Sequence, residues 1–149
     1  MKLGIANDHR GYKLKKEIIN RLNTKYEIID YGTDSEESVD YPDYAFKLGK
    51  KVAAKEVDFG IAICGSGIGI SIACNKVKGI RCAKVSTKNE AAVTRVDNNA
   101  NIVAFGEKTT IEDAIEIIET FVNTPFSNLE KHNRRINKIT EYEENNYAW

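Results

Sequence analysis

Three alternating glycines directly follow a cysteine near the middle of the chain, in the order Cys64-Gly65-Ser66-Gly67-Ile68-Gly69. The apolar run before it, residues 59–63, is typical of a strand buried on both faces of a parallel sheet. The small residues after it predict a helix. Cys64 would then lie where ligands bind in open α/β sheets and where backbone N–H groups stabilise anions and thiolates. We expect Cys64 to do chemistry, although a structural cysteine at a tight turn fits the same pattern.

The spacing around this cysteine excludes three common functions of glycine-rich loops. No Gly-Lys-Ser/Thr follows, as a Walker A loop requires. The glycines are spaced G-x-G-x-G after the third expected strand, whereas a dinucleotide fingerprint needs G-x-G-x-x-G after the first. The sixth residue after the cysteine is Ile70, where cysteine phosphatases carry an arginine. A thiol beside a cluster of N–H donors remains, and Cys74 and Cys82 are expected to pack as small apolar residues.

Further candidate side chains lie at the end of the first expected strand and near the C-terminus. Asp8 and His9 end that strand, and the ends of strands one and three are often neighbours in a doubly wound sheet, so both could face Cys64. His9 could bind a phosphate or transfer a proton, or it could be an exposed residue after a helix cap. Four basic residues enter the last expected helix, either as a solvated face or as a phosphate clamp for another subunit: Lys131, His132, Arg134 and Arg135.

Strand and helix patterns alternate along the chain, which is typical of a parallel sheet with helices on both faces. We predict a single domain over residues 1–149 with a three-layer α/β/α, Rossmann-like fold and a five-stranded parallel sheet. The expected strands cover residues 2–7, 26–30, 59–64, 80–85 and 101–105. The expected helices cover residues 12–22, about 42–55, the stretch after Gly69, 88 to about 97, 111–123 and about 129–143.

Apolar spacing in the last two expected helices predicts different environments for them. The helix over 111–123 carries a full core stripe, made of Ile111, Ile115, Ile118 and Val122. The helix from about residue 129 is strongly polar, and its main apolar residues are Ile136 and Ile139. We therefore expect residues 129–149, helix and tail, to contact a second subunit rather than to close the core of their own chain.

Composition and charge limit the classes of partner. The chain has 149 residues and equal numbers of basic and acidic side chains, 22 each, which argues against a nucleic-acid binder with a general basic surface. No apolar segment approaches the ~20 residues that span a membrane. The three cysteines form no C-x-x-C pair, so we expect neither disulfides nor zinc, and a cytoplasmic location.

Five strings resemble type B ribose-5-phosphate isomerases in order and spacing. The resemblance runs from Met1 to about Ile139, and the wider family includes galactose-6-phosphate and allose-6-phosphate isomerases. The strings are Asp8-His9-Arg10-Gly11, Glu37-Ser38-Val39-Asp40-Tyr41-Pro42-Asp43, Ile63-Cys64-Gly65-Ser66-Gly67-Ile68-Gly69-Ile70-Ser71, Asn75-Lys76-Val77-Lys78-Gly79-Ile80-Arg81 and His132-Asn133-Arg134-Arg135.

The resemblance implies an aldose–ketose isomerase that uses no metal or other cofactor and acts through a cis-enediolate. Cys64 matches the family's base, and Ser66 with the N–H groups of the glycine loop matches the pocket for the enediolate oxygens. Asp8 and Tyr41 match positions at the sugar hydroxyls, and Asn98 matches one at the ring or carbonyl oxygen. The remaining loop residues that match are Gly65, Gly67, Ile68, Gly69, Ile70 and Ser71.

The phosphate site that the resemblance implies combines His9 and Lys108 with Lys131 and Arg135, the later ones donated by a partner subunit in a homodimer or tetramer. Three departures from the family pattern involve four positions. Asp97 stands where the family usually has its ring-opening histidine, so an aspartate would have to take the anomeric proton. Lysines stand at 108 and 131 where arginines are common, which keeps the charge but loses bidentate geometry. Ser66 replaces a more usual threonine and keeps the hydroxyl.

The sequence therefore predicts an enzyme that interconverts ribose 5-phosphate and ribulose 5-phosphate. Two alternatives remain at this point. One is a hexose-6-phosphate isomerase of the allose or galactose type from the same family. The other is a weakly active sugar-phosphate-binding protein in which Asp97 has compromised turnover, although the retained Cys64 speaks against it.

Overall fold

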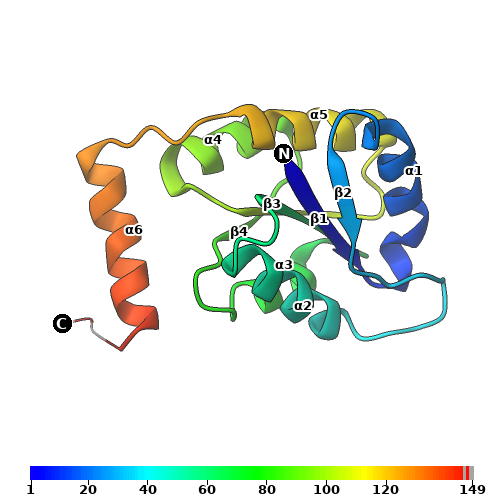
Figure 1. Cartoon of the computed structure of the whole chain (residues 1–149), viewed down its shortest axis with the longest axis horizontal. Coiled ribbons are helices and arrows are strands. Elements are labelled where there is room, and N and C mark those ends of the chain that lie inside the picture. The colour runs from blue at the N-terminus through cyan, green and yellow to red at the C-terminus, as the bar shows by residue number, and fades with distance from the viewer. Residues whose placement is uncertain (146, 148–149) are drawn as a thin grey trace.

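A five-stranded, wholly parallel sheet forms the centre of the protein in a computed structural model that describes residues 1–145 and 147. The strand order is β2-β1-β3-β5-β4, which confirms the predicted fold class (Figure 1). In register, Asn7 pairs with Ile63 and Cys64 pairs with Gly106, so the carboxyl ends of the three central strands meet. The strands are β1 (Lys2–Asn7), β2 (Glu27–Asp30), β3 (Phe59–Cys64), β4 (Cys82–Lys84) and β5 (Ile102–Gly106).

Helices cover both faces of this sheet (Figure 1). One face packs on α1 (Tyr12–Leu22), α4 (Lys88–Asn98) and α5 (Ile111–Asn123). The other packs on α2 (Tyr41–Ala53) and α3 (Ile68–Cys74), and a short 3-10 turn, η1 (His9–Gly11), follows β1. The chain closes with α6 (Glu130–Glu143).

Strand β3 shows how the alternation of side chains separates the two cores. Ile61 and Ile63 point to the face covered by α1 and α5, while Ala62 and Cys64 point to the face covered by α2 and α3. The second face is lined by small residues. A Cβ on Gly60, for example, would lie 3.1 Å from Val52 of α2. The close approach of α2 and α3 is what brings their first turns to the end of β3.

Some expected boundaries and core positions differ from those observed. Strand β4 is shorter than predicted, because only Cys82–Lys84 pairs with β5, although Ile80 and Val85 are buried beside it. In α5 the stripe that is buried deepest includes Ile117 and Phe121, while Ile111 and Ile115, both predicted as core, are only partly buried. The helix is therefore rotated by about one position from the predicted face.

Helix α6 stands apart from the sheet at the end of an extended linker (Figure 1). His132 is its only buried residue among those described. Contact with a second subunit stays a prediction, as does the assignment of residues 1–149 to one domain. Residues 146, 148 and 149 of the predicted contacting tail lie outside the described residues. Within the described part of the chain, no helix has both the length and the apolar character that crossing a membrane would need.

Candidate active site

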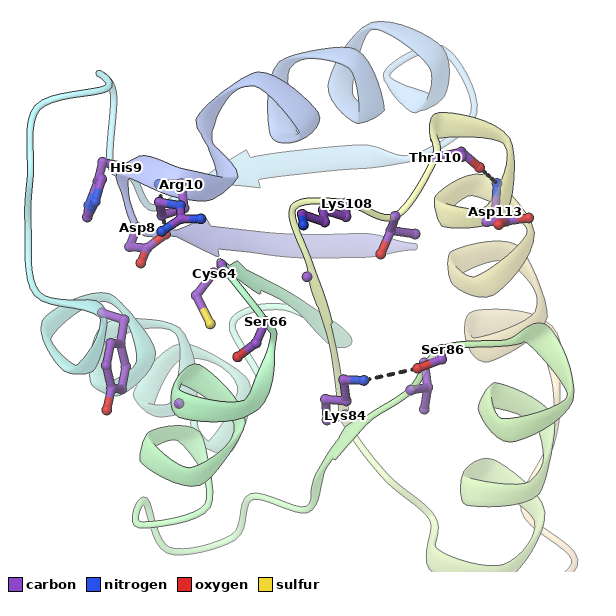
Figure 2. A pocket seen from close by; sticks show the side chains of 16 residues that line it. Asp8, His9, Arg10, Cys64, Ser66, Lys84, Ser86, Lys108, Thr110 and Asp113 are labelled. Carbon is purple, nitrogen blue, oxygen red and sulfur yellow. Dashed lines mark hydrogen bonds between the residues drawn. The ribbon is translucent and has the colours of Figure 1, made fainter.

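A cavity of about 910 Å³ opens at the carboxyl ends of β1, β3, β4 and β5 (Figure 2). This is the edge of a parallel sheet at which α/β proteins bind ligands. The strand pairing that was expected, with β1 beside β3, carries Asp8 to the cysteine: the N–H of Asp8 donates to the carbonyl of Ile63 at 3.1 Å. Eight of the predicted site residues line this cavity: Asp8, His9, Tyr41, Cys64, Gly65, Ser66, Gly69 and Lys108.

Cys64 ends β3 with its side chain against the start of α3. It is 4 % exposed, and its Sγ accepts a hydrogen bond from the N–H of Gly67 at 3.2 Å. Gly67 has φ of +79°, and a Cβ there would lie 2.7 Å from the carbonyl carbon of Phe105. Only glycine fits both the left-handed backbone and this close approach. The glycine therefore holds an N–H donor against the thiol, where it stabilises negative charge on sulfur.

The first turn of α3 leaves further donors beside Cys64. The hydroxyl of Ser66 accepts from the N–H of Ile68 at 3.1 Å. The carbonyl of Gly67 is the first acceptor of the helix, and it accepts from the N–H of Ser71. The N–H groups of Gly69 and Ile70 have no acceptor among the described residues, because the first turn of a helix has no preceding turn to donate to, so both can donate to a ligand. The side chains of Ile68, Ile70 and Ser71 do not line the cavity, since Ile70 is buried and Ser71 Oγ donates to Ile68 O at 2.7 Å.

Asp8 and His9 are both held by backbone donors. Asp8 caps η1, and its Oδ1 accepts from the N–H of Arg10 at 2.9 Å. His9 Nδ1 accepts from the N–H of Val39 at 3.2 Å, so the ring proton of neutral His9 sits on Nε2. The loop that follows β2 thereby fixes the orientation of the imidazole.

Tyr41 reaches the cavity from the first turn of α2 and packs on the glycine loop. A Cβ on Gly69 would lie 2.7 Å from Tyr41 Cζ, so the absence of a side chain at Gly69 is what lets the ring lie over this backbone. Tyr41 as a whole is 39 % exposed and lines the cavity, so a ligand can reach it.

Several polar residues that the sequence did not predict complete the cavity wall. Lys84 ends β4 and donates to Ser86 Oγ at 3.0 Å, and Thr110 and Asp113 come from the start of α5 (Figure 2). Arg10 pairs with Glu107, Nε to Oε2, at 2.6 Å. The hydrogen bond to Glu107, with its charge, raises the pKa of Arg10, and the same pair lowers the pKa of Glu107. Arg10 follows the end of β1 by three residues and Glu107 follows the end of β5 directly, and this closeness to strand ends was the signal that the sequence offered for them.

Apart from the glycine loop and the first turn of α3, four predicted site residues lie away from this cavity in the single chain. Asp97 and Asn98 end α4, just before β5 begins, whereas the cavity lies at the other end of that strand, about 13 Å away at roughly 3.3 Å per residue. The carboxylate of Asp97 lies 3.5 Å from His132 Nε2, and Asn98 accepts from Thr94. Lys131 and Arg135 lie on α6, which stands away from the cavity.

The two remaining cysteines are neighbours in the core under α2 and α3, as expected for small apolar residues. A hydrogen bond with Cys74, together with burial, raises the pKa of the Cys82 thiol. Over residues 1–145 and 147, no group of three His, Cys, Asp or Glu side chains could hold a metal ion. That the reaction needs no cofactor stays a prediction.

Comparison with known proteins gives one consistent family. The model of the family described as Ribose/Galactose Isomerase matches residues 3–139. The putative sugar phosphate isomerase YwlF of Bacillus subtilis is 47% identical, and the match covers 98% of this chain and 99% of that protein. Ribose-5-phosphate isomerase B of Escherichia coli is 40% identical, and the match covers 96% of this chain and 97% of that protein.

Solved structures agree in fold over nearly the whole length. Ribose-5-phosphate isomerase B of Clostridium thermocellum superposes with a TM-score of 0.93 at 46% identity, and the match covers 97% of this chain and 99% of that one. The enzyme of Mycoplasma genitalium, solved with bound ribulose-5-phosphate, has a TM-score of 0.90 at 39% identity, and 96% of each chain is covered.

Proposed function

Because the chain belongs to the ribose/galactose isomerase family, we propose that it interconverts ribose 5-phosphate and ribulose 5-phosphate. It is an isomerase of the intramolecular oxidoreductase class, in which hydrogen moves within one substrate. The Mycoplasma genitalium relative with bound ribulose-5-phosphate supports a pentose phosphate as the ligand of the cavity.

The observation that carries the proposal is the Sγ of Cys64 at the base of the cavity, 3.2 Å from the N–H of Gly67. A thiolate there would take the proton from C2 of the open-chain aldose. The electron pair of the C2–H bond would form the C1–C2 double bond, and O1 would gain negative charge. Return of the proton from sulfur to C1, with transfer of the hydroxyl proton from O2 to O1, gives the ketose. Cys64 therefore acts as a base and forms no bond to carbon.

The cis-enediolate that forms between these steps needs donors aimed at its two oxygens. The hydroxyl of Ser66 and the free N–H of Gly69, both in the cavity wall with Cys64, suit that role, and the N–H of Ile70 follows on the same turn. Each such donor contributes roughly 3 kcal/mol to the stabilisation of a developing oxyanion in a water-poor site. The backbones of Gly65, Gly67, Ile68 and Ser71 build the turn that presents these donors.

The substrate's hydroxyl and phosphate ends would be held by different groups. Asp8 and Tyr41 line the same cavity and suit the sugar hydroxyls. His9, with its proton on Nε2, and Lys108 suit the phosphate. A phosphate dianion held by these two groups alone would be only partly neutralised. Lys131 and Arg135 would supply further positive charge from a partner subunit, which makes the active form a homodimer or a larger assembly.

A partner subunit would also supply Asp97 and Asn98, since neither reaches the cavity of its own chain. Asp97 would take the proton of the anomeric hydroxyl and open the furanose ring, while Asn98 would contact the ring or carbonyl oxygen. In this arrangement His132 would lie beside the ring-opening group, because its Nε2 is 3.5 Å from the Asp97 carboxylate.

A coupled assay of the purified protein tests the proposed substrate. Ribose 5-phosphate is expected to give a higher kcat/KM than allose 6-phosphate or galactose 6-phosphate. A preference for either hexose phosphate would reassign the enzyme within its family. Binding of all three without turnover would favour the alternative of a sugar-phosphate-binding protein.

A further inference from the structure

Arg10 lies in the short turn η1, directly after the proposed substrate contacts Asp8 and His9, and its side chain reaches Glu107 at the end of β5. Its backbone N–H is fixed by the Asp8 carboxylate at 2.9 Å, and it directly follows His9 in η1. Its side chain is 56% exposed and lines the cavity above Cys64 (Figure 2). The guanidinium lies over the glycine loop, with Cζ 3.6 Å from the place where a Cβ on Gly65 would sit.

A guanidinium has two edges that can each donate a pair of parallel hydrogen bonds, and Glu107 occupies only one edge of Arg10. Arg10 Nε donates to Oε2 at 2.6 Å and Nη2 donates to Oε1 at 3.2 Å. The N–H of Glu107 donates to the carbonyl of Gly65 at 3.2 Å, so the backbone that carries this carboxylate is anchored on the loop of Cys64. A guanidinium has five N–H donors. Both donors of Nη1 and the second donor of Nη2 have no partner among the described residues. One N–H of Nη1 and the second N–H of Nη2 form the other edge.

A free guanidinium edge fits two oxygens of one phosphate, whereas a lysine offers a point charge. The other cations of the cavity, Lys84 and Lys108, are lysines. An exposed ion pair contributes little to folding, so stability alone does not explain why both ends of this pair are anchored. We propose that Arg10 is a further phosphate-binding residue of this cavity and that Glu107 is its positioning residue. The assignment rests on the proposed function for the presence of a phosphate.

Inorganic phosphate is the probe that tests Arg10 without turnover. In calorimetric titration, Arg10→Gln should weaken phosphate binding about tenfold, as loss of a charge-assisted bidentate contact predicts. Arg10→Lys should recover only part of the loss, because it restores charge without the second donor. Lys25→Gln is the matched control, since it breaks an equally short exposed pair with Glu119, 2.6 Å, away from the cavity, and it should leave binding unchanged. Equal affinity in wild type and Arg10→Gln would overturn the assignment.

Steady-state kinetics separate this inference from the proposed function. For ribose 5-phosphate, Arg10→Gln should raise KM about tenfold and leave kcat within about twofold, because the contact is made equally in ground and transition states. Arg10-dependent phosphate binding in a protein that turns over no ribose 5-phosphate would reject the proposed function and retain the phosphate contact. A loss in kcat with unchanged KM would reject the contact.

Glu107 is tested by a double-variant cycle on the same phosphate titration. Glu107→Gln keeps one acceptor and should weaken phosphate binding about threefold through looser orientation of the guanidinium. In the Arg10→Gln background it should add nothing, because its effect passes through Arg10. Additive losses, or tighter binding in Glu107→Gln alone, would show that Glu107 does not act by positioning Arg10.

Discussion

The backbone N–H of Val39 donates to Nδ1 of His9 at 3.2 Å, and this bond decides which ring nitrogen faces the cavity as a donor. Val39 belongs to the loop between β2 and α2, so the geometry of an imidazole at the end of β1 depends on a segment thirty residues later. With Nδ1 accepting, Nε2 carries the proton and can donate to a phosphate oxygen.

Two isosteric substitutions separate the roles of these nitrogens. An asparagine amide occupies the place of Nδ1, while a glutamine amide reaches the place of Nε2. His9→Asn should therefore keep the anchor to Val39 but raise KM for ribose 5-phosphate about tenfold, the loss of one charge-assisted hydrogen bond. His9→Gln should retain more affinity. Initial rates over a range of substrate concentrations make the comparison, and a larger KM for the glutamine variant would contradict the assigned tautomer.

Removal of the thiol should stop the proton transfer and spare the binding site. Cys64→Ala is expected to lower kcat roughly 10³-fold, the usual contribution of a general base, while inorganic phosphate still binds. Cys74→Ala is the matched control, because that cysteine is buried away from the cavity and should leave kcat unchanged. Turnover close to wild type in Cys64→Ala would remove the thiol from the mechanism.

The sequence was sufficient to predict the part of the site that depends on strand ends. Parallel strands fix the place of their carboxyl ends, so the meeting of Asp8, His9 and Cys64 followed from element order alone. Arg10 and Glu107 come from turns 97 residues apart, and their pairing depends on where β5 lies beside β3, which the pattern did not determine. Any residue that a second chain would supply to the site is equally impossible to place from the strand pattern of one chain.

Hydrophobic periodicity also missed one structural feature, because it counts only apolar residues. Lys15 lies on the buried face of α1 and is 1 % exposed. Its Nζ donates to Asp30 Oδ1 at 3.1 Å and to the carbonyl of Thr33, so a cation anchors the start of the loop that carries Val39. A lysine between Leu14 and Ile18 gives no sign of this in the sequence.

Replacement of that buried lysine should destabilise the fold. Lys15→Met removes the side-chain donor of the Thr33 carbonyl and the cation beside the Asp30 carboxylate, which would keep only the N–H of Gly32, so we expect a loss of about 2–3 kcal/mol in the free energy of unfolding. Urea denaturation measures it. Lys16→Met is the control, since this neighbouring lysine is exposed and should change stability by less than about 0.5 kcal/mol. Equal midpoints for the two variants would show that the buried contacts contribute nothing.

Asp97 should limit the rate of ring opening. An aspartate can accept the anomeric proton but cannot donate as an imidazolium does, so Asp97→His is expected to raise kcat for ribose 5-phosphate several-fold, which is a part of the roughly 10²–10⁴-fold that a general acid or base contributes. Asp97→Asn, which can do neither, should lower it. A fall in kcat for the histidine variant would instead show that Asp97, with His132 beside it, is adapted to its task.

The position of α6 makes the shared site testable by mixing inactive chains. Lys131 and Arg135 lie on α6, away from the cavity that holds Cys64, so each active site would combine two chains. Cys64→Ala damages one half of such a site, and the double variant Lys131→Gln/Arg135→Gln damages the other. Random pairing after joint refolding gives half heterodimers, each with one intact site, so about a quarter of wild-type activity should return at low substrate.

The matched control pairs two variants that damage the same half of the site. Cys64→Ala mixed with Asp8→Ala leaves no intact site in any heterodimer, because both residues line one chain's cavity, so mixing should restore nothing. Sedimentation of the mixtures should show dimers or larger assemblies in both cases. An active monomer, or no recovery from the first mixture despite dimer formation, would show that Lys131 and Arg135 do not complete a partner's site.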